Sequence, residues 1–404
     1  MKVLVQKYGG SSMSDMEKIG HVADKVNAAY RIDYQVVVVV SAMGKATDQL
    51  IALAHQAALT GADYSVELSR RELDMLVSTG ERVSMALLCI ALHARGCNAV
   101  SLTGSQAGII TSIDHFDAQI MEVRPFRVKQ QLEQGRVVVV AGYQGVSYKG
   151  EVTTLGRGGS DTTAVALAAT LGAERCEIYS DVDGVYSGDP KIVKEPYHWP
   201  TIELPILQEM AEVGAKVING RAIEWARRKD VHIVARKASD HHRPDASFRE
   251  TIASEPKTGA VQEKIYAVVS FPQVVQACVE RTQWSALLRR ITEFSLPPLD
   301  FYGAQNTIKC LIPLLHMPDA EYCCQSLKQE FADSLTFTPP MGLISVIGGR
   351  KKILERLTDI FDHLEEDEIN PLSVTGGPFR VSTLIDLSRL EEVQNRLHTL
   401  LIES

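Results

Sequence analysis

Short apolar segments alternate with longer amphipathic ones through the first part of the chain. The short segments are rich in β-branched residues and apolar at nearly every position, which is typical of strands buried on both faces of a sheet. They cover residues 3–8, 36–42, 137–142, 176–181 and 231–235. Between them, apolar residues recur at helical spacing, as after Ser14 and Glu17, whose spacing predicts a capping box. This alternation predicts a mainly parallel α/β sheet sandwiched by helices.

The pattern changes after Val234. Residues 235–259 are polar and interrupted by Pro244 and Pro256, which predicts a linker. Beyond it, strand-like segments (265–271, 307–315, 343–347, 379–385) alternate with helical ones (285–294, 320–331, 350–364, 390–401). This part of the chain therefore predicts two small α+β units. We place one domain at residues 1–255 and a second, tandem domain at residues 256–404.

Composition narrows the class of protein. A chain of 404 residues is expected to form two domains. The net charge of −8 argues against a nucleic-acid or anionic-membrane surface. No apolar run approaches the roughly 20 residues needed to cross a bilayer, and no signal peptide is indicated. The seven cysteines contain no CxxC pair, so we expect reduced, mostly buried thiols in a cytoplasmic protein that binds neither nucleic acid nor membrane.

A glycine pair follows the first predicted strand. In "VLVQKYGGSSMSD", Lys7 ends the strand, and Gly9 and Gly10 precede a helix. Bare backbone N–H groups at a helix start suit a phosphate, although the segment is neither a Walker A loop nor GxGxxG. A plain tight turn accounts for the glycines equally well.

A second glycine-rich segment, "GRGGSDTTAVALAATLGA", begins at Gly156. Ser160 or Asp161 can cap the helix that follows and that ends at Gly172. Capping leaves Arg157 unexplained between glycines, where its guanidinium could pair with a carboxylate or phosphate. An anion held by Arg157 beside a cation held by Asp161 would be a zwitterion. This arrangement points to a free amino acid as ligand.

Other acidic residues have more than one explanation. Glu81 near the start of an apolar helix fits the helix dipole, but it could serve as a second acid for an ammonium group. Asp181 and Asp183 follow a strand, where open α/β sheets bind nucleotides or metals. Turn propensity explains Asp183 but not Asp181. Lys216, in a helical stretch, has no assignment from the residues alone, and no HExxH or EF-hand spacing occurs.

Seven segments resemble the ordered blocks of the aspartate kinase family, in the amino-acid kinase superfamily. They are "KYGGSS", "VVSAMGKATDQL", "STGERVSMALL", "VVVAGYQG", "TTLGRGGSDTTAVALA", "YSDVDGVYSGDP" and "VGAKVINGRAIEWA". The match runs through about residues 2–235, and "GRGGSDTT" with "YSDVDGVY" is its specific pair. The resemblance implies a parallel sheet between helices, followed by paired ACT domains that bind effector amino acids.

The resemblance also implies roles for single residues. Lys7, Lys216 and Asp161 would be catalytic, with the two lysines beside the ATP phosphates. The nucleotide site would comprise Lys7, Gly9, Gly10, Ser11, Ser180, Asp181, Tyr186, Lys191 and Lys216. The amino acid would be held by Thr47, Glu81, Arg157, Ser160 and Asp161, with Arg157 on its α-carboxylate. Mg²⁺ would be held mainly through the ATP phosphates, without a protein metal site.

The implied activity is ATP-dependent phosphorylation of the side-chain carboxylate of L-aspartate, the first step of aspartate-family amino acid biosynthesis, which leads to lysine and threonine. A homodimer or larger assembly through ACT-like units is expected by analogy. Departures from the family pattern are Asp48, where Asn is usual, Lys191, where many relatives have Arg, and "TQWS" in place of an effector-pocket turn. Two alternatives stay open: a paralogue acting on another amino acid, or a catalytically silent amino-acid or nucleotide-binding regulator.

Overall fold

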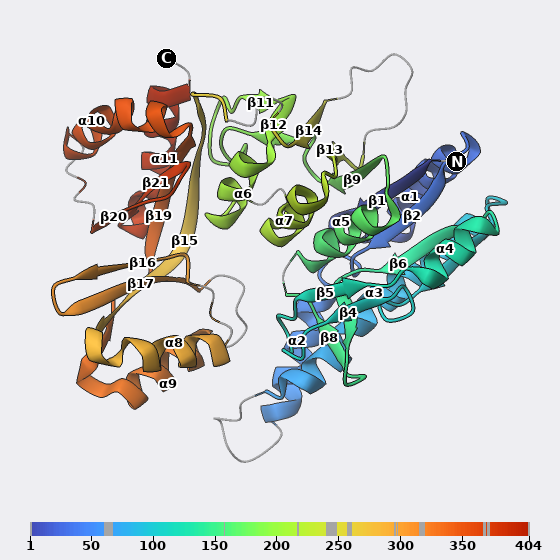
Figure 1. Cartoon of the computed structure of the whole chain (residues 1–404), viewed down its shortest axis with the longest axis horizontal. Helices are drawn as coiled ribbons and strands as arrows, with labels where there is room; N and C mark the ends of the chain where they lie inside the picture. Colours follow the sequence, from blue (N-terminus) through green and yellow to red (C-terminus); the bar gives the residue numbers. More distant parts are fainter. Residues whose placement is uncertain are drawn as a thin grey trace. The chain divides into compact units, whose positions relative to one another are not determined.

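The computed structural model describes residues 2–59, 68–156, 158–215, 218–239, 249–256, 261–294, 296, 298–314, 320–366, 369 and 372–402 (Figure 1). The chain divides into two compact units. Unit 1 comprises Met1–Val185, Trp199–Leu204 and Val217–Glu255. Unit 2 comprises Tyr186–His198, Pro205–Lys216 and Pro256–Ser404, so two internal segments of the chain belong with its C-terminal part.

Unit 1 is built on an eight-stranded sheet with the order β12-β14-β13-β9-β1-β2-β6-β3. Its strands are β1 (Val3–Tyr8), β2 (Gln35–Val40), β3 (Ala99–Leu102), β6 (Val137–Ala141), β9 (Arg175–Ser180), β12 (Thr201–Glu203), β13 (Ile233–Lys237) and β14 (Glu250–Ser254). Every neighbouring pair is parallel except β13 and β14. The predicted mainly parallel sheet is therefore confirmed.

The prediction that 235–259 is a linker was wrong in part. β14 lies within that segment and pairs antiparallel with β13, so β13 is not the last strand of the sheet. β14 alternates buried and exposed residues, and so it lacks the continuous apolar run that marks the central strands. Residues 240–248 and 257–259 of the predicted linker lie outside the described residues.

Helices cover both faces of this sheet, as predicted (Figure 1). On one face, α1 (Met16–Arg31) and α3 (Arg70–His93) form a core with alternate residues of β1, β2 and β6. On the other face, α5 (Gly159–Leu171) and α7 (Gly220–Lys229) lie side by side. α3 is long and apolar enough to cross a membrane by length and composition alone, and 44% of its most apolar window is buried inside the protein, including Leu88 and Leu92.

A smaller sheet and further helical segments complete unit 1. The four-stranded sheet β5-β4-β7-β8 consists of β4 (Ile109–Thr111), β5 (Ile120–Val123), β7 (Gln144–Ser147) and β8 (Val152–Thr154). The remaining helices are α2 (Ala46–Leu59), α4 (Phe126–Glu133) and the 3-10 turn η1 (Gly10–Met13). Three further elements contain the points where the chain changes from one unit to the other. They are β10 (Val185–Tyr186), β11 (His198–Trp199) and α6 (Leu204–Glu212).

Three predicted helix ends differ from the observed ones. The N-cap of α1 is Asp15, whose side chain accepts from Lys18 N at 2.9 Å, rather than Ser14. α5 begins at Gly159 after an N-cap at Gly158, so Ser160 and Asp161 lie inside its first turn. The predicted end at Gly172 is confirmed, with a left-handed φ of 63°. α3 begins at Arg70, which places Glu81 in the middle of the helix and removes the helix-dipole explanation for it.

Unit 2 contains a seven-stranded antiparallel sheet whose central strand is β15 (Ile265–Glu280). Its other strands are β16 (Asp300–Ala304), β17 (Thr307–Pro313), β18 (Leu335–Phe337), β19 (Met341–Gly348), β20 (Ser373–Gly376) and β21 (Arg380–Ile385). β15 first pairs with β19; after a register shift next to Gln273, which has a φ of 60°, it pairs with β17 and β18.

The two parts of β15 belong to two hydrophobic cores. Its first part packs with α10 (Arg350–Glu366) and α11 (Leu390–Ile402). Its second part packs with α8 (Trp284–Glu293) and α9 (Ala320–Phe331). The prediction of two small α+β units is confirmed, and the structure adds that they share one strand.

A buried arginine ties together distant segments of unit 2. Arg380, at the start of β21, pairs with Glu209 at 2.7 Å, Glu212 at 3.1 Å and Asp300 at 2.8 Å. Its side chain is 8% exposed. The Arg380 cluster, defined by these four residues, joins α6 to the antiparallel sheet.

All seven cysteines are free thiols. Five are buried, and Cys278 and Cys324 are half-buried. The prediction that the cysteines are mostly buried is confirmed.

Candidate functional site

The carboxyl ends of β1, β2 and β6 meet at one edge of the unit 1 sheet. Gly10 follows β1, Ala42 follows β2 and Gly142 follows β6. A Cβ on Gly10 would lie 2.9 Å from the carbonyl oxygen of Ala42, and one on Gly142 would lie 2.7 Å from Ser160 Oγ. Both positions therefore require glycine for close approach of the backbone, at the edge where open α/β sheets bind ligands.

A buried ion pair links β1 to α5 at this edge. Lys7 Nζ lies 2.7 Å from Asp161 Oδ1, and the two side chains are 11% and 9% exposed. Asp161 Oδ2 accepts from the backbone N–H of Asn219 at 3.2 Å. Asn219 is the N-cap of α7, and its Oδ1 also accepts from Thr162 at 3.2 Å. The first turns of α5 and α7 are thus fixed together around the acid that holds Lys7.

Glu81 reaches the same edge from the middle of α3. Its Oε1 accepts from the backbone N–H of Ala42 at 3.1 Å. Burial raises the pKa of Glu81 to about 8, against a smaller opposing effect of backbone hydrogen bonds. α3 approaches the segment after β2 closely because residue 80 is glycine: a Cβ there would lie 2.8 Å from Ala42 Cβ. Glu81 is therefore a buried carboxyl that stays largely protonated at neutral pH.

Unsatisfied polar atoms concentrate at this edge. Within the described residues, the buried side-chain atoms without a hydrogen-bond partner are Ser12 Oγ, Glu81 Oε2, Asp161 Oδ1, Ser373 Oγ and Arg380 Nε. The first three belong to the elements that meet here. Asp161 Oδ1 is close enough to Lys7 for an ion pair but lacks the alignment of a hydrogen bond. Since buried polar groups are normally paired, these atoms mark a place where a polar ligand would be bound.

Other predicted residues of unit 1 occupy the surrounding elements. Ser160 is buried in the first turn of α5, and Thr47 is half-buried in the first turn of α2. A Cβ on Gly9 would lie 3.5 Å from Lys7 Nζ, so Gly9 borders the lysine. Ser11 is exposed in η1, next to buried Ser12.

The predicted nucleotide residues after β9 are more scattered. Ser180 ends β9, where its hydroxyl donates to the carbonyl oxygen of Val182 at 3.1 Å, and Asp181 is exposed. Tyr186 and Lys191 belong to unit 2. There the ring of Tyr186 packs edge-on against His198, with 5.1 Å between ring centroids, and the backbone N–H of Lys191 donates to Asp189 at 2.9 Å. Arg157 and Lys216 lie outside the described residues.

A second ion pair supports the segment before α5. Arg221 in α7 makes a bidentate pair with Asp117, at 2.8 and 2.7 Å, and also donates to the carbonyl oxygen of Leu155 at 3.5 Å. Burial raises the pKa of Asp117, although Arg221 opposes the shift. The pair therefore anchors the backbone just before the glycine-rich turn.

Sequence reasoning missed three residues of this edge. Ser12 is the buried serine of "GGSS", Asn219 lies in "VINGRAIE", and Arg221 follows it by two residues. Asn219 carried a local signal, since Asn before a helical pattern is a common N-cap. Its contact with Asp161 joins two helices distant in sequence and had no local signal. The described residues contain no group of three side chains able to hold a metal ion.

Comparison with known proteins agrees with this geometry. Residues 2–235 match the Amino acid kinase family. The chain is 49% identical to an aspartokinase of Geobacillus stearothermophilus, over 98% of this chain and 97% of that protein. It is 38% identical to an aspartokinase of Mycolicibacterium smegmatis, over 98% and 96% of the two chains.

Solved structures agree on the fold. Aspartokinase III of E. coli, in complex with aspartate and ADP in its R-state, has a TM-score of 0.84 at 22% identity, covering 98% of this chain and 99% of that one. Aspartate kinase from Synechocystis is 31% identical with a TM-score of 0.54, covering 98% of this chain and 69% of that one. The amino-acid kinase fold followed by ACT-like units is thus confirmed, and the chain belongs to the aspartokinases of the amino acid kinase family.

Proposed function

We propose that this chain transfers the γ-phosphoryl group of MgATP to the side-chain carboxylate of L-aspartate, giving 4-phospho-L-aspartate and ADP. The observation that carries the proposal is the near-full-length match to aspartokinases. Two buried polar atoms without a hydrogen-bond partner, Ser12 Oγ and Glu81 Oε2, support it, because they lie at the edge where open α/β sheets bind ligands.

The reaction needs no general base. One oxygen of the aspartate side chain attacks the γ-phosphorus, and the bond to the β,γ-bridging oxygen breaks with its electron pair leaving on ADP. With a reference pKa of about 3.9, the attacking carboxylate is already ionised at neutral pH. The main obstacle is repulsion between this carboxylate and the triphosphate, so catalysis depends on alignment and charge neutralisation.

Cations and bare backbone amides would neutralise that charge. Lys7 lies beside Gly9 and is held by Asp161, which places an ammonium group at the end of β1. We assign Lys7 and Lys216 to the phosphoryl group in transfer, and Gly9, Gly10 and Ser11 to the ATP phosphates. Ser180, Asp181, Tyr186 and Lys191 are proposed for the rest of the nucleotide. Mg²⁺ is proposed to enter with ATP, held mainly by its phosphates.

The amino acid would be held at both charged ends. We assign Arg157 to the α-carboxylate and Glu81 to the α-ammonium, with Thr47 and Ser160 as further contacts. We assign Asp161 to this site as well; because it also holds Lys7, it would connect the amino-acid and phosphate parts of the site. The unpartnered Oε2 of Glu81 supports its role as an acceptor for an ammonium group.

The wider setting is also proposed. The chain would act in the cytoplasm, at the start of the route to lysine and threonine. It would assemble as a homodimer or larger homo-oligomer through the ACT-like units of its C-terminal part. The proposed domain boundary stays at 255/256, with residues 1–255 catalytic and residues 256–404 regulatory.

ADP release measured with a panel of amino acids tests the proposal. L-Aspartate should stimulate ADP release strongly, and hydroxylamine should trap the acyl phosphate as a hydroxamate in equal amount. Stimulation by a different amino acid alone would identify a paralogue. Absence of ADP release with every amino acid, from folded protein, would contradict the proposed activity.

A further inference from the structure

A cavity lies on the face of the unit 1 sheet opposite Lys7. Because strand residues alternate between faces, β1 directs Lys7 towards α5, whereas Leu4 and Gln6 line the cavity. The cavity has a volume of about 430 Å³ and is bounded by α1 and by β1, β9, β13 and β14. We call it the rear cavity. Its volume is in the range of small-molecule sites.

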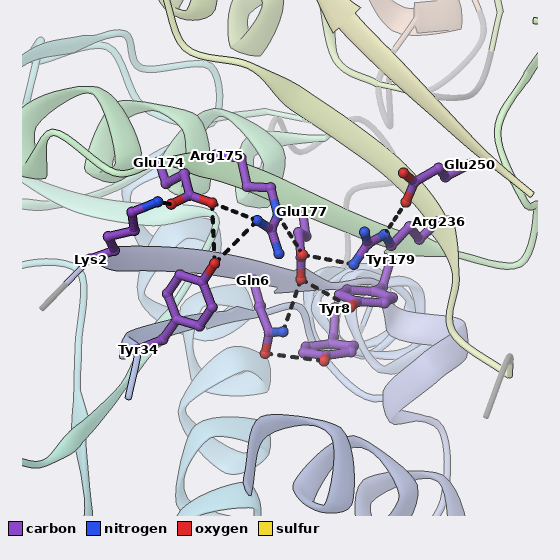
Figure 2. Close-up of polar contacts among 10 residues, drawn as sticks. All are labelled: Lys2, Gln6, Tyr8, Tyr34, Glu174, Arg175, Glu177, Tyr179, Arg236 and Glu250. Atoms are coloured by element: carbon purple, nitrogen blue, oxygen red, sulfur yellow. Dashed lines mark hydrogen bonds and ion pairs between the residues drawn. The ribbon is translucent and has the colours of Figure 1, made fainter. Parts of the chain in front are cut away.

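The floor of the rear cavity is a buried ionic network (Figure 2). Glu177, 1% exposed, lies between Arg175 at 2.8 Å and Arg236 at 2.7 Å, and accepts from Gln6 at 3.0 Å. Burial alone would raise the pKa of Glu177, but Arg236, Gln6 and Arg175 outweigh it and lower the pKa. Arg236 also pairs with Glu250 at 2.6 Å. The carboxylates of the floor are therefore already neutralised by the two arginines.

Further cations line the walls of the cavity. The lining includes Lys25, Lys237 and Arg249. Lys25 lies with its ammonium 5.4 Å from the centre of the Tyr179 ring. Neither Lys237 nor Arg249 forms an ion pair with any residue that the structure describes. They follow and precede the Arg236–Glu250 pair in the chain, and the described lining carries more cations than carboxylates. Such an excess of positive charge in a concave surface attracts anions.

The wall on the α1 side is apolar. Ala28, Ala29 and Ile32 line it, and Ile32 is 69% exposed although it is a large apolar residue. A ligand that fits this cavity would therefore combine negative charge with a compact apolar body.

We propose that the rear cavity binds a small organic dianion, with its charge near Lys25, Lys237 and Arg249 and its body against Ala28 and Ile32. The ligand class is a phosphomonoester or a dicarboxylate with an apolar group. This site is separate from the proposed substrate edge, and the proposal does not depend on aspartate being the substrate.

Isothermal titration calorimetry on the full chain, with saturating MgADP to occupy the nucleotide site, tests the proposal. Phenyl phosphate and isophthalate are the two dianionic probes, and benzyl alcohol is the neutral one. We expect one site per chain for at least one dianion and no binding of benzyl alcohol. The tighter dianion identifies the phosphate or the carboxylate class. Binding should weaken as NaCl is raised.

Variants locate the binding. Lys25→Met and Arg249→Met should each weaken the dianion about tenfold, the usual effect of losing a charged partner. Lys18→Met, on the same helix but outside the cavity lining, should bind as the wild type does. Lys25→Met should keep its ADP release rate without the probe. Failure of both dianions to bind, or binding unchanged in both cavity variants, would overturn the proposal.

Discussion

Lys7 Nζ lies 2.7 Å from Asp161 Oδ1, with both side chains largely buried. The cation that would face the ATP phosphates is therefore held in place before any nucleotide arrives. Such preorganisation reduces the cost of orienting charge during phosphoryl transfer. Replacing either residue would therefore leave the other as a buried charge without its partner.

Replacing Lys7 by Ala should lower kcat by about 100-fold or more, the usual effect of removing one preorganised charge-stabilising group. The KM for aspartate should change much less, because Lys7 is assigned to the phosphates. Steady-state ADP release at varied aspartate measures both quantities.

The control for this variant is a thermal melt. Removing one partner of a buried pair destabilises a protein, so the melting temperature should fall while a cooperative transition remains. A folded Lys7→Ala protein with near-normal kcat would remove Lys7 from the mechanism.

The protonated state of Glu81 predicts a pH effect on aspartate binding. With its pKa raised to about 8, the empty site holds Glu81 mostly neutral at pH 7, whereas an ammonium ligand favours the carboxylate. Aspartate binding should therefore release close to one proton, and the KM for aspartate should fall as the pH rises from about 6 to 8. Calorimetry in two buffers of different ionisation enthalpy measures the proton release.

Glu81→Gln is the matched variant. It should abolish the proton release. It should also remove a pH dependence of folding stability. In the wild type the folded pKa of Glu81 exceeds its ordinary value of 4.5, so stability that is present at low pH is lost as the pH rises towards about 8. The melting temperature of the wild type should thus fall with pH more steeply than that of Glu81→Gln. Equal proton release in both proteins would assign the titration to another group.

Arg157→Ala should raise the KM for aspartate by about 10-fold to 100-fold and leave kcat nearly unchanged. The reason is the loss of a charge-assisted contact to the α-carboxylate, typically worth about 1.5–3 kcal/mol. Steady-state kinetics with varied aspartate at saturating ATP checks it. An unchanged KM would contradict the contact assigned to Arg157.

Arg380→Leu should destabilise unit 2 by about 3 kcal/mol, because Glu209 and Asp300 would keep buried charge without a partner. Urea unfolding followed by fluorescence should show an earlier midpoint. Arg389→Leu is the control. Arg389 pairs with Glu392 at 2.7 Å on the surface, so this variant should lose less than about 1 kcal/mol of stability. Equal midpoints in the two variants would contradict the role of the Arg380 cluster.

The sequence predicted the central strands well and the edges less well. The bounds of β1 were correct because its residues are apolar on both faces, a pattern that few other structures share. β14 was missed because an edge strand alternates and carries few apolar residues. The start of α3 was placed too late because its first turn is polar, so the apolar pattern becomes clear only further along the helix.

The sequence indicated which residue types belong to the candidate site, but not which residues contact one another there. Charge placement beside glycines identified Lys7 and Asp161, but their ion pair joins segments that are distant in sequence. The raised pKa of Glu81 depends on burial in the folded chain, which no local pattern reports. Asn219 and Ser12 were missed for the same reason: their importance lies in which partners they meet, or lack.

The strand β15 belongs to two hydrophobic cores at once, and it is continuous from Ile265 to Glu280. Cutting the C-terminal region between its two α+β units would therefore leave each fragment with half a central strand and an exposed apolar edge. In the intact chain the two α+β units should unfold in a single step, and a fragment that carries one unit alone should aggregate. The two units would have to be inherited, duplicated or lost together.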